Sequence, residues 1–600
     1  MIKLSDYVIE SIAKQGVKHV FLLPGGGAMH LNDSLGKCPD IEFVCNLHEQ
    51  ASAIAAEAYA KVTNNLGVAI VTSGPGGTNT VTGLAGAWLD STPCLFISGQ
   101  VKRADLMGDL AVRQLGVQEV DIVSIVQSIT KYAITITDSN TIKYHLEKAL
   151  YLAKSGRPGP VWIDIPLDVQ GAMIDPEKQQ GFDSKEVSPS FDLHHLSNQV
   201  SQLIELLNEA ERPVLLVGNG VRLADGQKEF LELVEGLNIP VLATWLGLDL
   251  IASNHPLCFG RPGSMAPRGA NFTLQNSDLL LTIGARLDMA LTGYAHDKLA
   301  RAAKKIIVDI DQYEINKMKT KIELPICADA KDFIQELLKQ KDKLNLKNHE
   351  SWIKRCQEWK NKYPLVLPQY WEQTEGVSSY VFSQVLAEEL TSDDVIVSGS
   401  SGNGIEVFLL VFEVKTGQRI FHTRGLGSMG FGLPASIGAC LASDLRRTIC
   451  VDGDGGFQMN IQELETVHRL NLPIKFFVFN NQGFASIRSS QKKYFGRLVG
   501  ADATSGLTLP NLLNVASAYG LATAQISSSA NLREQIRDIL NSSDPIVCEV
   551  MVPTDEVRAP SLSSFKKDDG TMVSRPLEDL WPFLEREEFI SNMIVPLVEE

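Results

Sequence analysis

The chain has 600 residues, of which 44% are hydrophobic and 21% are charged, a composition typical of a packed globular protein. This composition excludes a disordered chain, a coiled coil and a collagen-like rod. The 55 basic and 71 acidic residues give a formal net charge of −16. A surface that acidic disfavours nonspecific binding to nucleic acid or to an anionic membrane, although backbone N–H groups can still hold a small anionic ligand.

Nine cysteines are scattered along the chain without a CxxC pair, and several of them lie in apolar runs. This pattern favours buried free thiols in a reducing compartment over disulfides or metal ligands. The first 16 residues predict an amphipathic helix rather than a signal peptide. No apolar run reaches the roughly 20 residues that a membrane-spanning helix needs. We therefore expect a cytoplasmic protein.

Apolar runs of strand length alternate with helix-length segments along almost the whole chain. Many of these runs end in Gly, Pro, Asn or Asp, as buried parallel strands do where they open into functional loops. The pattern predicts an α/β protein with doubly wound parallel sheets. Polar stretches near 172–195 and 338–375 predict connectors between domains. The predicted units are residues 1–172, 190–340 and 372–555, followed by a tail over 556–600.

In the first unit, glycine-rich turns follow two predicted strands, and an acidic residue follows a third. The turns are Pro24-Gly25-Gly26-Gly27 and Thr72-Ser73-Gly74-Pro75-Gly76-Gly77, and the acid is Glu49 at the start of a helical segment. Glycine-rich turns allow close approach of the backbone to a ligand, but alone they are weak evidence. The helix dipole also favours an acid at a helix start. These residues alone therefore assign no site.

The middle unit repeats this arrangement of glycine turns and strand-end acids. Glycine loops at strand ends admit a pyrophosphate, and acids at later strand ends suit ribose hydroxyls. The candidate residues are Gly218, Asn219, Gly220, Gly260, Arg261, Gly284, Ala285, Arg286, Asp288, Asp309 and Asp329. Because the segment GNG is not a full GxGxxG fingerprint, a purely structural middle domain is the alternative.

The third unit contains the most specific pattern. Gly453-Asp454-Gly455-Gly456 ends one predicted strand, and Asn480-Asn481 ends the next. The glycines let the backbone approach phosphate oxygens closely. The Asp454 carboxylate, the Asn481 amide oxygen and a carbonyl near Gly483 are ligands of the kind that Mg²⁺ prefers. Two ordinary strand-end turns would also contain Asp and Asn, but this spacing favours a metal–phosphate site.

This set of motifs resembles the thiamine-diphosphate-dependent enzymes, and most closely the acetolactate synthase (acetohydroxyacid synthase) large-subunit family, over nearly the whole chain. The resemblance implies an N-terminal pyrimidine-binding domain, a central domain and a C-terminal diphosphate-binding domain. It also implies that the Gly-Asp-Gly and Asn-Asn motifs hold the cofactor diphosphate through Mg²⁺. Glu49 would then contact N1′ of the aminopyrimidine and promote removal of the proton from the thiazolium C2.

Further segments match the family in the expected order. FHTRGLGSMG, residues 421–430, resembles the family segment GGLGTMG, which implies that Met429 holds the cofactor in its bent conformation. Gln118 matches a glutamine that lines the reaction cavity, and Lys131 matches a neighbouring lysine, with an ordinary surface lysine as an equal alternative. Loops implied to surround the cofactor contain Pro24, Gly25, Gly26, Gly76, Ser400, Ser401, Gly402, Asn403, Gly427, Gly453, Gly455 and Gly456.

The resemblance extends to cofactors and assembly. In this family the segments equivalent to the middle-unit loops wrap an FAD that takes no net part in the reaction, so we expect FAD beside thiamine diphosphate and Mg²⁺. The family also implies a homodimer or homotetramer with active sites between protomers. Glu49 of one protomer would then reach the cofactor whose diphosphate the other protomer holds.

Two positions depart from the acetolactate synthase pattern. The family motif GARFDDR ends in an arginine thought to hold the carboxylate of the second 2-oxo acid, whereas this chain has GARLDMA with Ala290 there. Alanine cannot replace a bidentate arginine fork. The tryptophan that selects the acceptor is also missing, and Ser490 occupies its place. The donor side therefore matches the family and the acceptor side does not.

We therefore expect a carboligase that decarboxylates pyruvate or a similar 2-oxo acid and transfers the two-carbon hydroxyethyl unit to a carbonyl acceptor. The acceptor would be something other than a second pyruvate, such as a nucleotide-linked keto sugar in an opened, less cationic pocket. The alternatives are a true acetolactate synthase, a C–C hydrolase, a simple 2-oxo acid decarboxylase, and a non-enzymatic regulatory or structural paralogue. The tail either covers this pocket as a lid, with Lys566, Lys567 or Arg575 in contact, or packs over the third unit.

Overall fold

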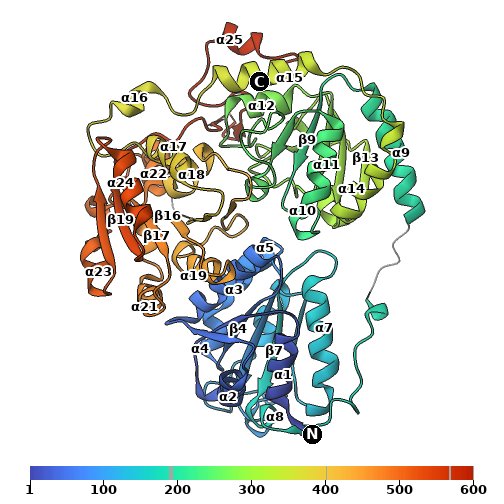
Figure 1. The fold of residues 1–600 in the computed structure, drawn as a ribbon, viewed down its shortest axis with the longest axis vertical. Helices are drawn as coiled ribbons and strands as arrows, with labels where there is room; N and C mark the ends of the chain where they lie inside the picture. Colours follow the sequence, from blue (N-terminus) through green and yellow to red (C-terminus); the bar gives the residue numbers. More distant parts are fainter. Residues whose placement is uncertain (188–192, 401, 567–568, 599–600) are drawn as a thin grey trace.

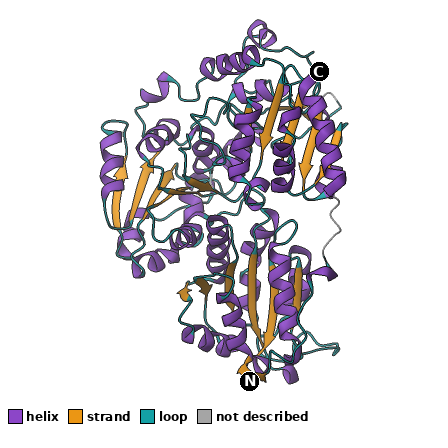
Figure 2. Ribbon diagram, turned by 45° about the vertical axis from the view of Figure 1, so that its right-hand side comes forward, coloured by secondary structure: helices purple, strands orange, loops and turns teal. Residues whose placement is uncertain are grey.

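The computed structural model describes residues 1–187, 193–400, 402–566 and 569–598, which fold into three α/β domains (Figure 1). The first domain lies at the bottom of this view, the central domain at the upper right and the third domain at the left. In each domain a parallel sheet lies among helices, as Figure 2 shows with strands in orange and helices in purple. The three sheets confirm the predicted fold class.

The first domain contains a six-stranded parallel sheet in the order β3-β2-β4-β5-β7-β6. Every residue of its central strand β4 is buried, as expected for a parallel strand that helices cover on both faces. The strands are β2 (His19–Leu22), β3 (Glu42–Cys45), β4 (Gly67–Val71), β5 (Cys94–Gln100), β6 (Tyr132–Thr135) and β7 (Val161–Pro166). The main helices are α1 (Leu4–Ala13), α2 (Met29–Lys37), α3 (Glu49–Thr63), α4 (Pro75–Asn79), α5 (Val81–Leu89) and α7 (Ile142–Lys154).

The central domain contains a five-stranded parallel sheet in the order β10-β9-β11-β12-β13. Its strands are β9 (Pro213–Val217), β10 (Val241–Ala243), β11 (Leu279–Ile283), β12 (Lys304–Asp309) and β13 (Leu324–Cys327). Its helices are α9 (Leu193–Glu209), α10 (Gly220–Leu223), α11 (Gln227–Leu237), α12 (Arg268–Gln275), α13 (Gln312–Asn316), α14 (Ala330–Lys339) and α15 (Glu350–Lys362).

The third domain contains a six-stranded parallel sheet in the order β15-β14-β16-β17-β19-β18. Its strands are β14 (Val395–Ser398), β15 (Arg419–Phe421), β16 (Thr448–Gly453), β17 (Ile474–Asn480), β18 (Ala522–Ile526) and β19 (Ile546–Met551). Its main helices are α17 (Ser379–Glu389), α18 (Glu406–Val411), α19 (Gly432–Ala442), α20 (Asp454–Phe457), α21 (Leu464–Arg469), α22 (Ala485–Phe495), α23 (Leu512–Ala518) and α24 (Leu532–Asn541).

The first and third domains share one topology. When the six strands of each sheet are numbered in chain order, both sheets read 2-1-3-4-6-5, and the central sheet reads 2-1-3-4-5. The direction of winding reverses between the first and third of these strands. Ligands of open α/β sheets bind at that switch point, beyond the carboxyl ends of the strands. The topology therefore directs attention to the loops after β2 and β4, after β9 and β11, and after β14 and β16.

Helices α3 and α19 join the first domain to the third. Both helices are rich in small residues, and most of their side chains are buried. At Gly438 the two backbones meet so closely that an added Cβ atom would lie 2.1 Å from the carbonyl oxygen of Ala55. This contact holds the start of α3, where Glu49 lies, in a fixed relation to the loop that precedes α19.

The second predicted connector is largely an ordered part of the central domain. Helix α15 lies within the polar stretch 338–375 and buries Trp352, Cys356 and Trp359 in the central core. These residues have the i, i+4, i+7 spacing of a helix face. The polar composition of the stretch concealed this apolar stripe.

One interpretation of the sequence expected the tail to pack over the third domain, but the tail packs mainly on the central domain. It forms a hairpin of β20 (Ser564–Lys566) and β21 (Met572–Ser574), and then α25 (Arg586–Ser591). Three amides in and after α12 bind it: Asn271 donates to the Leu577 carbonyl at 2.7 Å, Gln275 to Glu578 at 2.7 Å, and Asn276 to the Asn592 carbonyl at 3.0 Å. The tail is therefore a cover of the central domain.

All nine cysteines are free. No helix in the described ranges is long and apolar enough to cross a membrane.

Candidate active site

The switch point of the third domain brings the Gly-Asp-Gly and Asn-Asn motifs together. Asp454 begins α20 directly after β16 and is nearly buried. Its Oδ1 accepts a hydrogen bond from the Gly455 N–H at 2.8 Å, and its Oδ2 accepts one from the Gly483 N–H at 3.0 Å. Burial raises the pKa of Asp454 to about 6, although these backbone donors favour its charged form. A cation beside this carboxylate would offset the cost of burying its charge.

The two asparagines at the end of β17 point in different directions. The Asn480 amide donates to Glu549 Oε1 at 2.8 Å, inside the domain. Asn481 is 4% exposed, and its Oδ1 has no hydrogen-bond partner among the described residues. A buried acceptor without a partner costs free energy. Asn481 therefore presents the oxygen that a Mg²⁺ ion can use, close in the chain to Gly483 and, through it, to Asp454.

Glycine is required at two places in these loops. Gly483 has φ +138°, and an added Cβ atom would lie 2.3 Å from the carbonyl oxygen of Ala501. A Cβ atom on Gly455 would lie 2.3 Å from the ring of Phe484. Both loops are therefore packed too closely for any other residue. Gly453 ends β16, and Gly456 is buried within α20.

The loop after β14 is tied to the loop that contains Met429. The Ser400 hydroxyl donates to the carbonyl of Ser428, so the two loops lie side by side. Gly402 has φ +41°, in the left-handed region. Ser401 lies outside the described residues. The side chain of Met429 is 37% exposed. These loops present an open surface at the carboxyl edge of the third sheet.

The side chain of Asn403 does not face this surface, so the predicted contact of this residue with the diphosphate would have to come from its backbone. Its side chain is buried, and its amide donates to Glu556 Oε2 at 2.9 Å. Glu556 Oε1 also accepts from the Ser378 hydroxyl at 2.7 Å and the Ser379 N–H at 3.0 Å. The hydrogen bond between Asn403 and Glu556 therefore holds the loop after β14 on its buried side. Burial raises the pKa of Glu556, and its local sequence gave no signal of this role.

A buried charged cluster joins the first domain to the Met429 loop. The Lys61 ammonium lies 2.7 Å from Glu57 and 2.9 Å from Asp90, and all three side chains are almost fully buried. Asp90 accepts from the N–H groups of Arg424 at 3.1 Å and Gly425 at 2.8 Å. Burial raises the pKa of Glu57. We did not predict this cluster, although charged residues in the apolar helix AAEAYAK were visible in the sequence.

The switch point of the first domain gathers its predicted residues in the same way. Glu49 begins α3, is 7% exposed, and accepts a hydrogen bond on Oε2 from the Asn79 amide at 2.9 Å. The turn at Gly25 packs on Thr72, whose hydroxyl accepts from the Gly27 N–H at 3.1 Å. These contacts join the loops after β2 and β4. Asn79 is a further site residue that we did not predict.

Gln118 lies at the mouth of this region, and Lys131 does not. Gln118 is exposed with φ +64°, and Gly74 packs against its backbone. The Lys131 ammonium instead donates to the Ser155 carbonyl at 2.5 Å, just past the C-terminal end of α7. Burial lowers the pKa of Lys131 to about 8. The structure therefore gives Lys131 a partner in its own domain.

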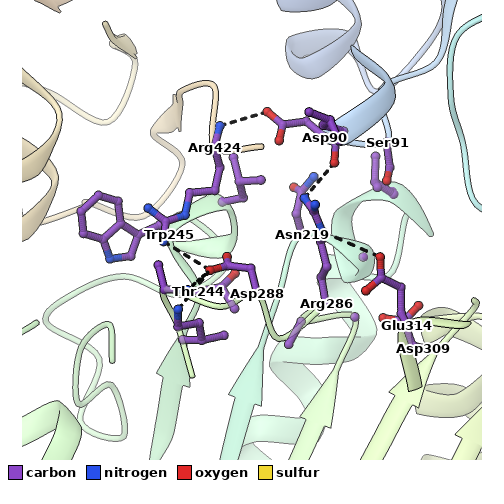
Figure 3. A pocket seen from close by; sticks show the side chains of 18 of the residues that line it. Asp90, Ser91, Asn219, Thr244, Trp245, Arg286, Asp288, Asp309, Glu314 and Arg424 are labelled. Carbon is purple, nitrogen blue, oxygen red and sulfur yellow. Dashed lines mark hydrogen bonds and ion pairs between the residues drawn. The ribbon is translucent and has the colours of Figure 1, made fainter. Parts of the chain in front are cut away.

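A cavity of about 350 Å³ lies where the three domains meet (Figure 3). The first domain contributes residues 89–91 and 156–158, and the third domain contributes Ser400, Glu406 and Arg424. Most of the central-domain candidates line it: Asn219, Gly220, Gly284, Ala285, Arg286, Asp288, Asp309 and Asp329. Gly218 lies just behind the lining, with its Cα packed against the Gly284 carbonyl. No described residue of the tail lines this cavity, so the lid interpretation is not supported there.

Two central-domain predictions lie away from the cavity. Gly260 does not line it, and the Arg261 guanidinium donates to the carbonyls of Leu410 at 3.1 Å and Phe412 at 3.0 Å. Burial lowers the pKa of Arg261. Arg261 therefore joins the central domain to the end of α18. Its Nη2 atom, which donates to both carbonyls, has no free donor for an FAD phosphate.

Several groups in the lining of the cavity fit a dinucleotide. The Asn219 Oδ1 atom is buried and has no hydrogen-bond partner within the part of the chain that the structure describes. Asp309, the last residue of β12, and Asp329, two residues beyond β13, line the cavity, and burial raises the pKa of both carboxyl groups. A ribose hydroxyl near either group, and a pyrophosphate beside the glycine turn at Gly220, would fit these residues.

Comparison with known proteins gives a match in each domain. The family model described as "Thiamine pyrophosphate enzyme, N-terminal TPP binding domain" matches residues 2–125. Those described as the central domain and the C-terminal TPP binding domain match residues 200–337 and 403–550. The chain belongs to the thiamine-diphosphate-dependent enzymes.

Individual relatives narrow this assignment. "Acetolactate synthase, chloroplastic" of Arabidopsis thaliana is 34% identical, with 94% of this chain and 83% of that protein covered. "Acetolactate synthase 2, chloroplastic" of Nicotiana tabacum is 35% identical, over 94% and 84%. "Probable acetolactate synthase large subunit" of Methanocaldococcus jannaschii is 33% identical, over 92% of each chain. The resemblance to acetolactate synthases is confirmed, and this thiamine-diphosphate enzyme is acetolactate synthase-like.

The two departures lie in different surroundings in this thiamine-diphosphate enzyme. Ala290 lines the large cavity, and its N–H donates to Asp288 Oδ1 at 2.9 Å. Ser490 is exposed on α22, with its hydroxyl bonded to the Ile487 carbonyl. Ala290 places no cation at that position, but the lining of the cavity still includes three cations, Arg157, Arg286 and Arg424, beside six carboxylates.

Proposed function

We propose that the chain is a thiamine-diphosphate-dependent carboligase that decarboxylates pyruvate or a similar 2-oxo acid. It transfers the two-carbon hydroxyethyl unit to a carbonyl acceptor other than pyruvate, for which a nucleotide-linked keto sugar is one candidate. The observation that carries this proposal is the position of Glu49 and of the Asp454–Asn481 pair. They lie beyond the carboxyl ends of the sheets in two domains with the same strand order.

The residues divide the work between the two domains. When bound, thiamine diphosphate would supply a thiazolium ring whose C2 carbon can add to a carbonyl and whose positively charged nitrogen can accept the electrons released by decarboxylation. Asp454, Asn481 and the Gly483 carbonyl hold Mg²⁺ and, through it, the diphosphate. Glu49, oriented by Asn79, holds or accepts a proton at its carboxylate. Met429 and Gln118 orient the cofactor and the substrate from the open edges of their domains.

FAD is the proposed occupant of the large cavity, where it contacts Asn219, Gly220, Asp309 and Asp329.

The proposed location is the cytoplasm. The free cysteines fit this location, since disulfides are rare in reducing compartments.

We propose a homodimer or a dimer of dimers as the active form. Large apolar side chains are exposed on the segments that flank the two half-sites, and a soluble protein rarely leaves such a surface uncovered. They are Phe43, Leu47, Leu115, Val117, Met459, Ile487, Tyr494 and Phe495. A second copy that covers them would bring Glu49 of one protomer to Asp454 of its partner.

Subunit mixing tests this arrangement. Glu49→Gln and Asp454→Asn variants are each expected to be inactive, because each lacks one half of every site. Random reassortment of the two should restore about one quarter of the wild-type activity, since half of the dimers are hybrids with one intact site. The measurement is pyruvate consumption after mixing and equilibration. A mixture as inactive as its parents would show that both residues serve one site within a single protomer.

Product analysis tests the reaction. With pyruvate alone, we expect slow CO₂ release without matching acetolactate, and a clear increase in pyruvate consumption when an aldehyde or keto-sugar acceptor is added. The second candidate is a true acetolactate synthase, which the identity to acetolactate synthases over most of the chain favours. Rapid acetolactate formation from pyruvate alone would establish that candidate. Acetaldehyde release that no acceptor changes would indicate a simple decarboxylase.

A further inference from the structure

The large cavity carries a cation beside the position where the acetolactate synthase motif has its arginine. Asp288 Oδ1 accepts the Ala290 N–H at 2.9 Å, and the Arg424 Nη2 atom lies 3.4 Å from the same oxygen. Ala290 belongs to the central domain and Arg424 to the third domain. The arginine missing at residue 290 is therefore matched by a guanidinium that reaches the same place from a different domain.

The position of Arg424 is fixed before any ligand binds. Its backbone N–H donates to the Asp90 carboxylate at 3.1 Å, and Asp90 forms an ion pair with Lys61. Its guanidinium lies over the ring of Trp245, 4.9 Å from the ring centroid, a favourable cation–π distance. Figure 3 shows Arg424 extended between Trp245 and Asp288. A side chain held in this way loses little conformational entropy when it binds an anion.

Among the cations of the cavity, Arg424 has more unused hydrogen-bond donors than Arg157 and as many as Arg286. Arg157 contacts Asp311 and Glu314 at 2.9 and 2.7 Å. Arg286 donates to the Leu89 carbonyl at 2.8 Å. A guanidinium has five N–H donors. Among the described residues, the guanidinium of Arg424 makes one hydrogen bond, the long 3.4 Å contact with Asp288.

The Asp288 oxygen that Arg424 contacts is already occupied. It accepts the N–H groups of Ala290 at 2.9 Å and Leu291 at 3.0 Å. Burial alone would raise the pKa of Asp288, but the charge of Arg424 and these backbone donors lower it, so the carboxylate stays charged. Asp288 therefore orients Arg424 and leaves most of its fork free. The side chain of Arg424 is 25% exposed.

The cavity connects Arg424 to the loops proposed to face the cofactor. Ser400 and Gly427 line it together with Arg424, and Gly427 lies two residues before Met429. A ligand group held by Arg424 is therefore near the place where the two-carbon unit would be transferred.

We propose that Arg424 is the acceptor-binding cation, which holds a carboxylate or phosphate group of the carbonyl compound that receives the two-carbon unit. This inference rests on the proposed carboligase function. It assigns the acceptor to the class of anionic aldehydes and ketones, a class that also contains the second pyruvate of a true acetolactate synthase, and it explains how the chain dispenses with an arginine at residue 290. A guanidinium fork binds either group in a bidentate manner.

The test uses the holoenzyme with pyruvate as donor and matched pairs of acceptors. One pair is glyceraldehyde 3-phosphate and glyceraldehyde, and the other is succinic semialdehyde and butanal. Arg424→Gln is expected to raise the KM of the preferred anionic acceptor by about 10–100-fold, the range for loss of a charged hydrogen-bonding partner. The KM of the neutral partner should change less than twofold. The pair that responds identifies phosphate or carboxylate as the group.

Further measurements separate this inference from the proposed function. Pyruvate decarboxylation without acceptor, followed as CO₂ release, should be within twofold of wild type in Arg424→Gln. No pyruvate turnover in the wild-type enzyme would contradict the proposed function, whereas equal effects on charged and neutral acceptors would overturn only the role of Arg424. A loss of bound flavin in Arg424→Gln, read from absorbance near 450 nm, would also overturn it, by assigning Arg424 to the dinucleotide.

Two more variants sharpen the result. Arg157→Gln removes a cation of the same cavity whose donors already contact two carboxylates, and it should not discriminate between charged and neutral acceptors. Ala290→Arg in the Arg424→Gln background restores a cation beside Asp288. The double variant should have a KM for the anionic acceptor at least fivefold lower than that of Arg424→Gln. An unchanged KM in the double variant would overturn the equivalence of the two positions.

Discussion

Replacement of Glu49 by Gln is expected to lower kcat with pyruvate by about 10²–10⁴-fold, the usual effect of removing a general acid–base group. The carboxylate at the start of α3 is nearly buried and has one oriented partner, the Asn79 amide. Glutamine has the same shape and can still accept that hydrogen bond, but its amide cannot take up or release the proton. Folding and cofactor binding should therefore persist while turnover is lost.

Glu350→Gln is the matched control for this variant. Glu350 is also the first residue of a long helix, α15, but it is exposed and distant in the chain from every proposed site residue. Loss of its charge near a helix N-terminus costs at most about 1 kcal/mol. Turnover equal to wild type is expected for Glu350→Gln. Full turnover in Glu49→Gln as well would remove the acid–base role assigned to Glu49.

The candidate site could be predicted where chemistry follows strand ends. Asp454 and Asn481 end adjacent parallel strands, and the carboxyl ends of such strands meet at one edge of a sheet. The family resemblance then supplied the roles of Glu49 and Met429. The sequence could not show which of the two asparagines faces the edge. That choice depends on Glu549, 69 residues further along the chain, which binds Asn480.

Residues that act through distant partners were missed or misplaced for the same reason. Asn403 lies in a predicted cofactor loop, but Glu556 draws its amide into the interior from 153 residues away. Arg261 lies in a glycine-rich loop, but its Nη2 atom donates to two carbonyls of the third domain. Local sequence describes the loop, whereas the direction of a side chain is set by the domain that packs against it.

The net charge of −16 is compatible with anionic ligands because the charges around the sites are arranged locally. Asp90 does not repel a ligand from the Arg424 loop, because Lys61 neutralises it and two backbone N–H groups bind it. At the third-domain edge, backbone N–H groups surround Asp454, and Asn481 offers an uncharged oxygen. Backbone donors and a bridging cation can thus bind phosphate on an acidic protein.

Removal of either proposed Mg²⁺ ligand is expected to abolish metal-dependent binding of thiamine diphosphate. Asp454→Asn removes the charged ligand, and Asn481→Ala removes the buried oxygen that lacks a protein partner. Loss of an outer-shell partner of a metal lowers metal affinity by about 10–100-fold, and each of these variants should lower the affinity for Mg²⁺ by more than that. Titration of thiamine diphosphate at fixed Mg²⁺, followed by calorimetry, measures this loss. Treatment of the wild-type protein with EDTA should have the same effect, reversed by added Mg²⁺.

Asn480→Ala is the matched control, because it removes the same side chain from the adjacent residue. The Asn480 amide donates to Glu549 inside the domain, and its oxygen accepts from the Gln482 N–H at 3.0 Å, so its loss should lower the thermal midpoint slightly and weaken cofactor binding far less than the loss of a metal ligand. Ligands that bind only the native state raise its stability. Mg²⁺ with thiamine diphosphate should therefore raise the thermal midpoint of the wild type and of Asn480→Ala, but not of Asp454→Asn or Asn481→Ala. Equal stabilisation of all four proteins would place the metal elsewhere and leave the Asn481 oxygen without its proposed ligand.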